Sequence, residues 1–156
     1  CNGCQLMVEL NLINPEHQNR SKLVHNKSHK FESAFVGLDI PQNNSVMLQS
    51  LSNSSLGVWV AHGEGRFILP ESLDKYNVIA TYHYADYPAN PNGSDHNVAG
   101  ICSADGLHLA MMPHPERAIF PWQNAYYPSN RVADEVTPWF EAFVNARKWV
   151  ESKTSK

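Results

Sequence analysis

The sequence has little of what membrane-spanning, disulfide-stapled or nucleic-acid-binding proteins need. No apolar run approaches the roughly 20 residues that cross a bilayer. The cysteines number three, and an odd count with two of them in one turn argues against a disulfide framework. The 12 Lys and Arg residues do not outnumber the 15 Asp and Glu residues, so no basic surface is expected. We therefore expect a reducing, cytoplasmic compartment, with neither nucleic acid nor a membrane as partner.

The composition is instead that of a folded globular chain. Of 156 residues, 42% are apolar and 17% are charged, which is enough apolar material for one hydrophobic core and too little charge for a disordered chain. We expect one folded unit over residues 1–150. Residues 151–156 are polar and are expected to fray as a tail.

Helical and strand patterns alternate along the chain. Apolar residues at helical spacing predict a helix directly after Cys1, and Thr137-Pro138 is typical of the start of a second helix. Asp105-Gly106 predicts a hairpin turn between two strands. The expected strands are 31–38, 57–61, 78–84, 97–103 and 107–112. The opening turn normally follows a strand, so we expect the first part of the fold to lie upstream of Cys1.

The opening turn carries a candidate nucleophile. A nucleophile elbow places a reactive side chain on a sharp turn between a strand and a helix, and Gly3 would let the backbone fold tightly there. Cys1 suits this position because the helix N-terminus favours its thiolate. The N–H of Asn2 can then donate into an oxyanion hole. Cys4 would already lie in the helix and point into packing.

Redox and metal roles for these thiols are less well supported. The spacing of Cys1 and Cys4 also fits a redox pair or half of a zinc site. A zinc site needs further ligands at matching spacing, whereas Cys102 stands alone in an apolar strand. His25 and His29 would share a face only in a helix, and the residues between them do not form a convincing one.

A second segment supplies a base and a carboxylate. His114 and Glu116 are two residues apart, and Pro115 between them predicts an extended backbone on which both side chains face the same way. One imidazole nitrogen would then face a thiol while the carboxylate holds the other. The segment follows an apolar strand, where α/β enzymes place catalytic residues.

Five ordered segments resemble one family over nearly the whole chain. Residues 1–5 resemble the nucleophile turn of class I (triad) glutamine amidotransferases, and residues 112–117 resemble their His-x-Glu segment. Residues 59–66, 87–94 and 145–149 are similar to the C-terminal glutaminase domain of the large, single-chain phosphoribosylformylglycinamidine synthases. The resemblance implies the flavodoxin-like, three-layer α/β/α fold of class I glutamine amidotransferases, of which this chain would be the C-terminal portion.

The resemblance also implies an activity. Cys1 would attack the side-chain amide carbon of glutamine. His114, oriented by Glu116, would protonate the departing ammonia and then activate the water that releases glutamate. Gln5 matches a family position near the bound glutamine, and His62-Gly63 matches a segment that lines the glutamine pocket or a domain interface.

The implied partners lie outside this chain. Family members pass ammonia to an ATP-dependent synthetase domain that converts formylglycinamide ribonucleotide to the amidine in purine biosynthesis. ATP and Mg²⁺ would bind there, and no metal or other cofactor is expected in this chain. Family members also carry a Gly-rich oxyanion loop and several strands before the cysteine. We therefore expect the upstream polypeptide to pack against this chain, which should neither fold nor work alone.

Two other interpretations stay open. An N-terminal-nucleophile amidotransferase would use Cys1 with its own α-amine as the base, and it would need no His-Glu pair. A catalytically inert regulatory or interaction domain could share the scaffold. Such a domain usually lacks a triad residue, whereas all three residue types are present here.

Overall fold

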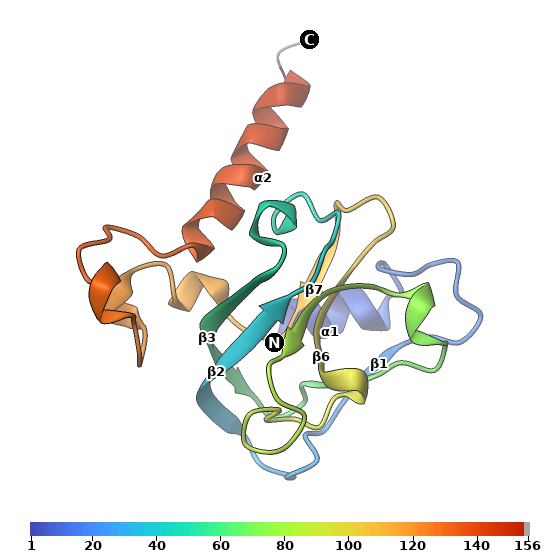
Figure 1. Ribbon diagram of the computed structural model, residues 1–156. Coiled ribbons are helices and arrows are strands. Elements are labelled where there is room, and N and C mark those ends of the chain that lie inside the picture. The colour runs from blue at the N-terminus through green and yellow to red at the C-terminus, as the bar shows by residue number, and fades with distance from the viewer. Residues whose placement is uncertain (155–156) are drawn as a thin grey trace.

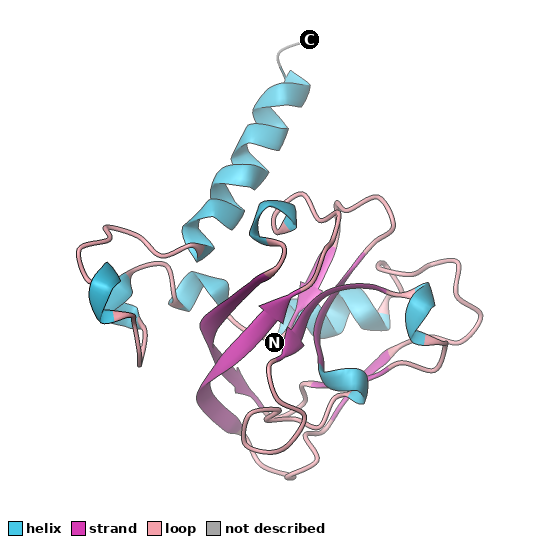
Figure 2. Ribbon diagram, in the orientation of Figure 1, coloured by secondary structure: helices cyan, strands magenta, loops and turns pink. Residues whose placement is uncertain are grey.

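The computed structural model describes residues 1–154, which form a curled sheet with helices on its two faces (Figure 1). Strands, helices and connecting turns are distinguished by colour in Figure 2. The helices and strands in chain order are α1 (Asn2–Glu9), β1 (Lys22–Val24), β2 (Glu32–Ile40), β3 (Ser54–His62), β4 (Arg66–Ile68), β5 (Asn77–Tyr82), β6 (Val98–Cys102), β7 (Leu109–Met111) and α2 (Trp139–Thr154). The predicted α/β class is confirmed.

The main sheet has the strand order β3-β2-β5-β6-β7, and β1 and β4 form a separate two-stranded sheet. All strand pairings within residues 1–154 are antiparallel. The longest pairing joins β2 and β3 over nine residues, from Glu32 opposite His62 to Ile40 opposite Ser54. Buried and less buried residues alternate along both strands, as expected where one face of a strand lies on the core. This long pairing fixes the position of the C-terminal end of β3.

The predicted hairpin joins β6 to β7. Gly106 has a φ of 77°, a conformation that L side chains rarely adopt, and the carbonyl of Asn44 occupies the place where a Cβ would stand. Asp105 supports the turn, since its carboxylate accepts hydrogen bonds from the Ser103 hydroxyl at 2.6 Å and from the Leu107 N–H at 3.1 Å. The Asp-Gly turn therefore works as its residue types predict.

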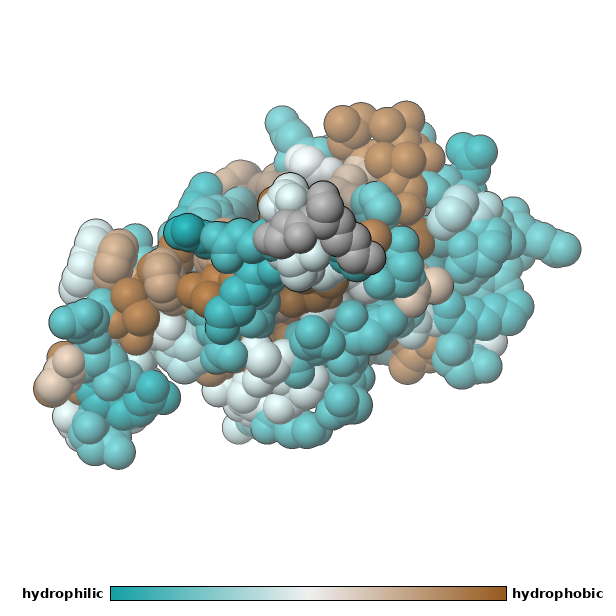
Figure 3. Space-filling view, turned by 90° about the horizontal axis from the view of Figure 1, so that it is seen from above, coloured by the Kyte–Doolittle hydropathy of each residue, from teal (hydrophilic) through white to brown (hydrophobic). Residues whose placement is uncertain are grey.

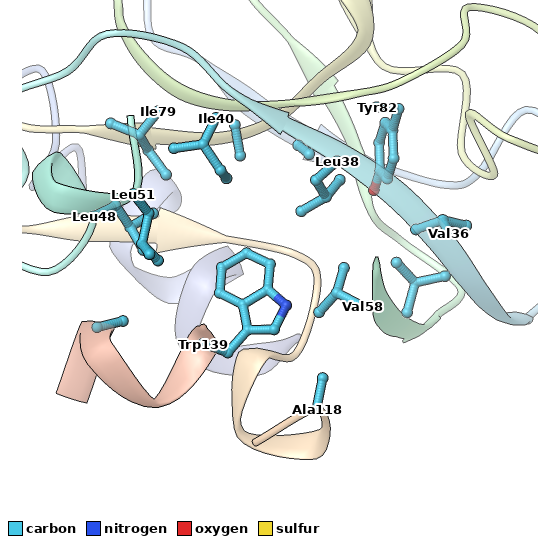
Figure 4. Close-up of a cluster of buried hydrophobic side chains, with 14 of the residues drawn as sticks. Val36, Leu38, Ile40, Leu48, Leu51, Val58, Ile79, Tyr82, Ala118 and Trp139 are labelled. Carbon is cyan, nitrogen blue, oxygen red and sulfur yellow. The ribbon is translucent and has the colours of Figure 1, made fainter. Parts of the chain in front are cut away.

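One hydrophobic cluster lies between the sheet and the start of α2 (Figure 4). Trp139 lies at its centre beside Val58 and is 1% exposed. The indole N–H of Trp139 donates to the carbonyl of Gly57 at 2.8 Å, so the one polar atom of the side chain is satisfied. This bond and the surrounding apolar contacts attach α2 to β3.

A second cluster lies on the opposite face, beneath α1. Cys4 and Val8 supply the buried side of α1. The two clusters lie on opposite faces because successive residues of β7 point in opposite directions: Ala110 belongs to the second cluster, whereas Leu109 and Met111 pack against the first. The sheet is thus covered by a helix on each face, in agreement with the expected layers.

The end of α2 differs from the expectation of a fraying tail. The helix continues through Thr154 and projects away from the sheet (Figure 1). An ion pair between Arg147 and Glu151 at 2.8 Å, with the i,i+4 spacing that suits a helix, supports the extension. The hydroxyl of Ser152 also donates to the Trp149 carbonyl at 2.7 Å. Residues 155 and 156 of the expected tail lie outside the described residues.

Replacing Trp139 with alanine is expected to destabilise the domain by about 3–5 kcal/mol, since it empties the centre of a packed cluster and removes the bond to Gly57. Trp149→Ala on the same helix is the matched control, because Trp149 is 37% exposed and its loss should cost about 1 kcal/mol or less. Denaturant unfolding followed by circular dichroism compares the two. Equal losses of stability would show that Trp139 does not anchor α2.

Candidate active site

Cys1 stands at the start of α1, as its N-cap residue. The backbone N–H of Gln5 donates to the Cys1 carbonyl at 3.0 Å, which closes the first helical turn. The first N–H groups of a helix, here beginning with that of Asn2, lack intrahelical acceptors. These N–H groups lie next to the residue that carries the candidate thiol, although the thiol itself accepts no hydrogen bond from them.

The edge of β3 holds both the thiol and the predicted base. The Cys1 Sγ donates to the Ala61 carbonyl at 2.8 Å and lies 3.9 Å from Nε2 of His114. The backbone N–H of His114 donates to the Trp59 carbonyl at 2.8 Å, in an isolated antiparallel bridge. Carbonyls two residues apart on a strand point the same way, so Trp59 and Ala61 set the separation of sulfur and imidazole. The structure thus brings together residues that are far apart in the sequence.

Glu116 meets the other imidazole nitrogen. Its Oε1 lies 2.6 Å from Nδ1 of His114, so Nδ1–H donates to the carboxylate and Nε2 is left as the proton acceptor facing the sulfur. The side chain of His114 is 14% exposed and that of Glu116 is 51% exposed. Arg117 shares the same carboxylate oxygen, since its Nε lies 3.7 Å away.

The route by which Glu116 reaches His114 differs from the prediction. His114 does avoid the helical region, with φ −110° and ψ 83°, as expected for a residue before proline. The expected extended segment is wrong, because Pro115–Arg117 forms a turn of 3₁₀ helix. Proline is well suited to the first position of a helical turn, and the turn folds the carboxylate back over the preceding imidazole.

The tight backbone expected at Gly3 is not seen. Gly3 lies within α1, and a Cβ there would meet nothing within 4 Å, so neither crowding nor an unusual backbone within residues 1–154 requires glycine. The approach of substrate past Gly3 stays a prediction. Gln5, in contrast, reaches the turn after β3. Its side-chain amide donates to the Glu64 carbonyl at 3.0 Å and lies 3.4 Å from the Glu64 carboxylate. Gln5 therefore ties α1 to the turn that begins at His62.

The buried side-chain amide of Asn26 holds the turn after β3 through several hydrogen bonds. Asn26 is fully buried, and its Nδ2 donates to the carbonyls of His62 at 2.7 Å and Lys30 at 2.9 Å. Its Oδ1 accepts from the N–H of Gly65 at 3.0 Å, and its backbone N–H donates to the Gly63 carbonyl at 2.9 Å. One residue therefore fixes the backbone before, within and after the turn. Sequence reasoning missed Asn26, because no local pattern pairs it with a turn so far along the chain.

His62 lies inside this network and not on the surface. It is 1% exposed, its Nδ1 lies 3.2 Å from Oδ1 of Asn26, and its Nε2 lies 3.5 Å from the amide of Asn92. Burial, and secondarily the charge of His114, lower the pKa of His62 to about 4. His62 is therefore neutral near pH 7, with Nδ1–H donating to Asn26. Asn92 also donates to the Gly65 carbonyl at 2.8 Å.

Two cavities bear on how accessible the site is. A cleft of about 480 Å³ borders Glu116 and Arg117 and includes Trp59 and Trp122 among its lining residues. A cavity of about 540 Å³ lies elsewhere, beside Lys27 and the 85–93 loop. Cys1 lines neither. Within residues 1–154 no group of three or more His, Cys, Asp or Glu side chains could hold a metal ion, and no helix is both long and apolar enough to span a membrane.

The chain belongs to the family of CobB/CobQ-like glutamine amidotransferase domains, whose model matches residues 1–150. Curated relatives include the probable phosphoribosylformylglycinamidine synthase of Arabidopsis thaliana, 42% identical over 97% of this chain. The human phosphoribosylformylglycinamidine synthase is 39% identical over 96% of the chain. This chain covers only 12% and 13% of those two proteins, so the relatives are far longer than the domain.

A solved structure shares the fold. PurLQS from Thermotoga maritima is 25% identical to this chain and superposes with a TM-score of 0.69, over 96% of this chain and 59% of that one. The amidotransferase family and fold predicted from the five sequence segments are confirmed. The roles of individual site residues remain proposals.

The buried His62 should make folding stability depend on pH. Its pKa falls from 6.5 to about 4 in the folded state, so the unfolded state takes up the proton first as pH drops. This group should leave stability unchanged above about pH 6.5 and remove about 3 kcal/mol between roughly pH 6.5 and 4. His62→Gln should flatten this part of the profile, measured by denaturant unfolding at several pH values. His29→Asn, at an exposed position, serves as the control; equal profiles for all three proteins would contradict the assignment.

Proposed function

We propose that Cys1, His114 and Glu116 hydrolyse glutamine and that the ammonia converts formylglycinamide ribonucleotide to formylglycinamidine ribonucleotide. The observation that carries the hydrolytic role is the contact of Cys1 Sγ with His114 Nε2 at 3.9 Å, while Glu116 holds Nδ1 at 2.6 Å. The acceptor is supported by the names of the relatives, which are phosphoribosylformylglycinamidine synthases.

Cys1, His114 and Glu116 each have a role in the proposed reaction. The thiol turns from the Ala61 carbonyl to His114, which takes its proton, and the sulfur attacks the amide carbon of glutamine. The oxyanion faces the N–H groups at the start of α1, including that of Asn2. The imidazolium, stabilised by Glu116, gives its proton to the departing ammonia. Water then loses a proton to His114 and cleaves the thioester, which frees glutamate and the thiol.

Glutamine is proposed to bind beside the turn after β3. Asn2 is exposed, while Gln5 and Gly63 are half-buried, so all three can reach a ligand next to Cys1. Gln5 donates to the Glu64 carbonyl, which supports a position for this pair at the edge of the proposed pocket. The buried side chain of His62 supports a contribution through the backbone of the turn that it stabilises.

The rest of the pocket is proposed to come from a larger protein that includes this domain. Curated relatives extend far beyond the matched region, and this chain covers only 12–13% of their length. Aromatic and aliphatic side chains also remain exposed, with Trp122 at 79%, Tyr126 at 74% and Val132 at 69%. Apolar surface is visible on the face seen from above (Figure 3). Such patches are typical of surfaces that other chain segments cover.

The synthetase step is proposed to take place in that larger protein. ATP and Mg²⁺ are assigned to the synthetase domain, as the resemblance to the family implies, and no step is routed through them here. All three cysteines are free thiols, which supports a reducing compartment such as the cytoplasm. The Arabidopsis relative is named as chloroplastic/mitochondrial, so the compartment can differ between relatives.

Substitutions in the full-length protein should separate the triad from the α-amine mechanism. His114→Ala should lower kcat for glutamine hydrolysis about 10³-fold or more, since no base then faces the thiol, and Glu116→Gln should lower it roughly 10²-fold. Cys1→Ser, which lacks the thiol nucleophile, gives the background rate of glutamine hydrolysis. Glutamate release measured by coupled assay reports all three. Near-normal activity of His114→Ala would support the α-amine of Cys1 as base and overturn the triad.

An electrophilic glutamine analogue tests whether the scaffold is catalytic at all. A triad thiol should form a covalent adduct with the analogue, at Cys1 and not at the buried Cys4 or Cys102. Peptide mass spectrometry of the labelled full-length protein locates the adduct, and competition with glutamine should slow its formation. A folded protein with Cys1 unmodified would support an inert regulatory domain.

Gln5→Ala should weaken glutamine binding without removing the chemistry. Because Gln5 ties α1 to the Glu64 carbonyl, its loss should raise KM about tenfold and change kcat little. Glu9→Ala, an exposed position at the other end of α1, is the control. Steady-state kinetics with glutamine measures both parameters. A fall in kcat with KM unchanged would place Gln5 in the chemical step instead.

A further inference from the structure

Cys4 is the part of the opening motif that glutamine hydrolysis does not use. It lies one helical turn after Cys1, is 7% exposed and belongs to the hydrophobic cluster beneath α1. We propose that Cys4 is the resolving thiol for an oxidised Cys1, so that the two form a reversible disulfide. The effect of such a disulfide on glutamine hydrolysis rests on the proposed function, in which Cys1 is the nucleophile.

The backbone places the Cα atoms of the two residues at a disulfide spacing. The Gln5 N–H donates to the Cys1 carbonyl at 3.0 Å, so residues 1–5 form a single α-helical turn. Residues three apart on a helix have Cα atoms about 5 Å apart, within the roughly 4.4–6.8 Å that disulfides need. Their Cβ atoms, about 5–6 Å apart, must come about 1 Å or more closer to bridge, a change that falls on Cys1 as the N-cap residue. Cys1 also packs against the cluster that contains Cys4, so both side chains lie on the inner side of the turn.

The environments of the two thiols give them different reactivity. Cys1 is half-buried and lies beside His114, which can take its proton, so it is the thiol of the two that an oxidant reaches. Burial raises the pKa of the Cys4 thiol to about 12, so Cys4 is inert until an electrophilic sulfur comes next to it. The oxidant therefore reacts with Cys1 first, and Cys4 stays reduced next to it as a resolving thiol.

The chemistry balances with a peroxide as oxidant. The Cys1 thiolate attacks one peroxide oxygen, the O–O bond breaks, and hydroxide leaves and is protonated to water. Cys1 is now a sulfenic acid, oxidised by two electrons. The Cys4 sulfur then attacks the Cys1 sulfur, the S–O bond breaks, and the Cys4 proton leaves with the oxygen as a second water. One peroxide is reduced to two waters, and two thiols become one disulfide.

The disulfide would stop glutamine hydrolysis and protect the nucleophile. Without a nearby thiol, a sulfenic acid is oxidised further to sulfinic acid, which reductants do not reverse. Cys102 cannot substitute for Cys4, because it is fully buried in the cluster on the opposite face of the sheet. It therefore provides a matched control within the same chain.

The test treats reduced full-length protein, and its Cys4→Ser, Cys4→Ala and Cys102→Ser variants, with hydrogen peroxide and then with dithiothreitol. Glutaminase activity is measured before and after each step, and mass spectrometry examines the peptide that carries Cys1. The wild type and Cys102→Ser should lose about 2 Da from this peptide and recover their activity on reduction. The Cys4 variants should gain about 32 Da at Cys1 and recover at least about fivefold less activity.

The readouts separate failure of this inference from failure of the proposed function. Low activity before oxidation, with intact folding, would argue against glutamine hydrolysis but leaves the mass measurement valid. Gain of about 32 Da by the wild-type peptide without any species lighter by about 2 Da would overturn the resolving role of Cys4. Recovery of the Cys4 variants to the wild-type level would overturn it as well. Two Cys4 substitutions are used so that one poorly folding variant does not decide the outcome.

Discussion

The site depends on the free edge of one strand. β3 uses one edge to pair with β2 along nine residues, and its other edge presents the carbonyls of Trp59 and Ala61. The first accepts the backbone N–H of His114 at 2.8 Å, and the second accepts the thiol of Cys1 at 2.8 Å. Because the repeat of an extended strand is nearly invariant, these two bonds set the distance between sulfur and imidazole more firmly than any loop could.

The rigidity of that edge has its own support. The β2 pairing and the Trp139 indole hold β3 on the core side, and Asn26 fixes the turn that follows it. Burying an amide such as Asn26 is favourable only if its polar atoms are paired, and each of them is. Burial keeps His62 neutral near pH 7, so it contributes no positive charge to the field at His114. Stability and catalytic electrostatics therefore rely on one set of contacts.

The sequence predicts the features that local chemistry determines. The hairpin at Gly106, the helix after Cys1 and the pairing of His114 with Glu116 each follow from residue types a few positions apart. It does not predict contacts between distant segments. Asn26 meets a turn 36 and more residues away, and only the folded sheet brings them together. The 3₁₀ turn after His114 was missed for another reason, because proline favours both an extended neighbour and the start of a helical turn.

The exposure of the carboxylate links the chemistry to assembly. Glu116 is 51% exposed and shares its Oε1 with Arg117, so in water its attraction for a charged His114 is weak. Covering this surface would lower the local dielectric and strengthen the same contact without moving an atom. Cys1 lines neither the cleft beside Glu116 nor the cavity beside Lys27, so a covering segment would also be needed to enclose glutamine. Both arguments support the proposed assembly: the residues of this domain set the geometry of the proposed triad, and packing against the rest of a larger protein would make it efficient.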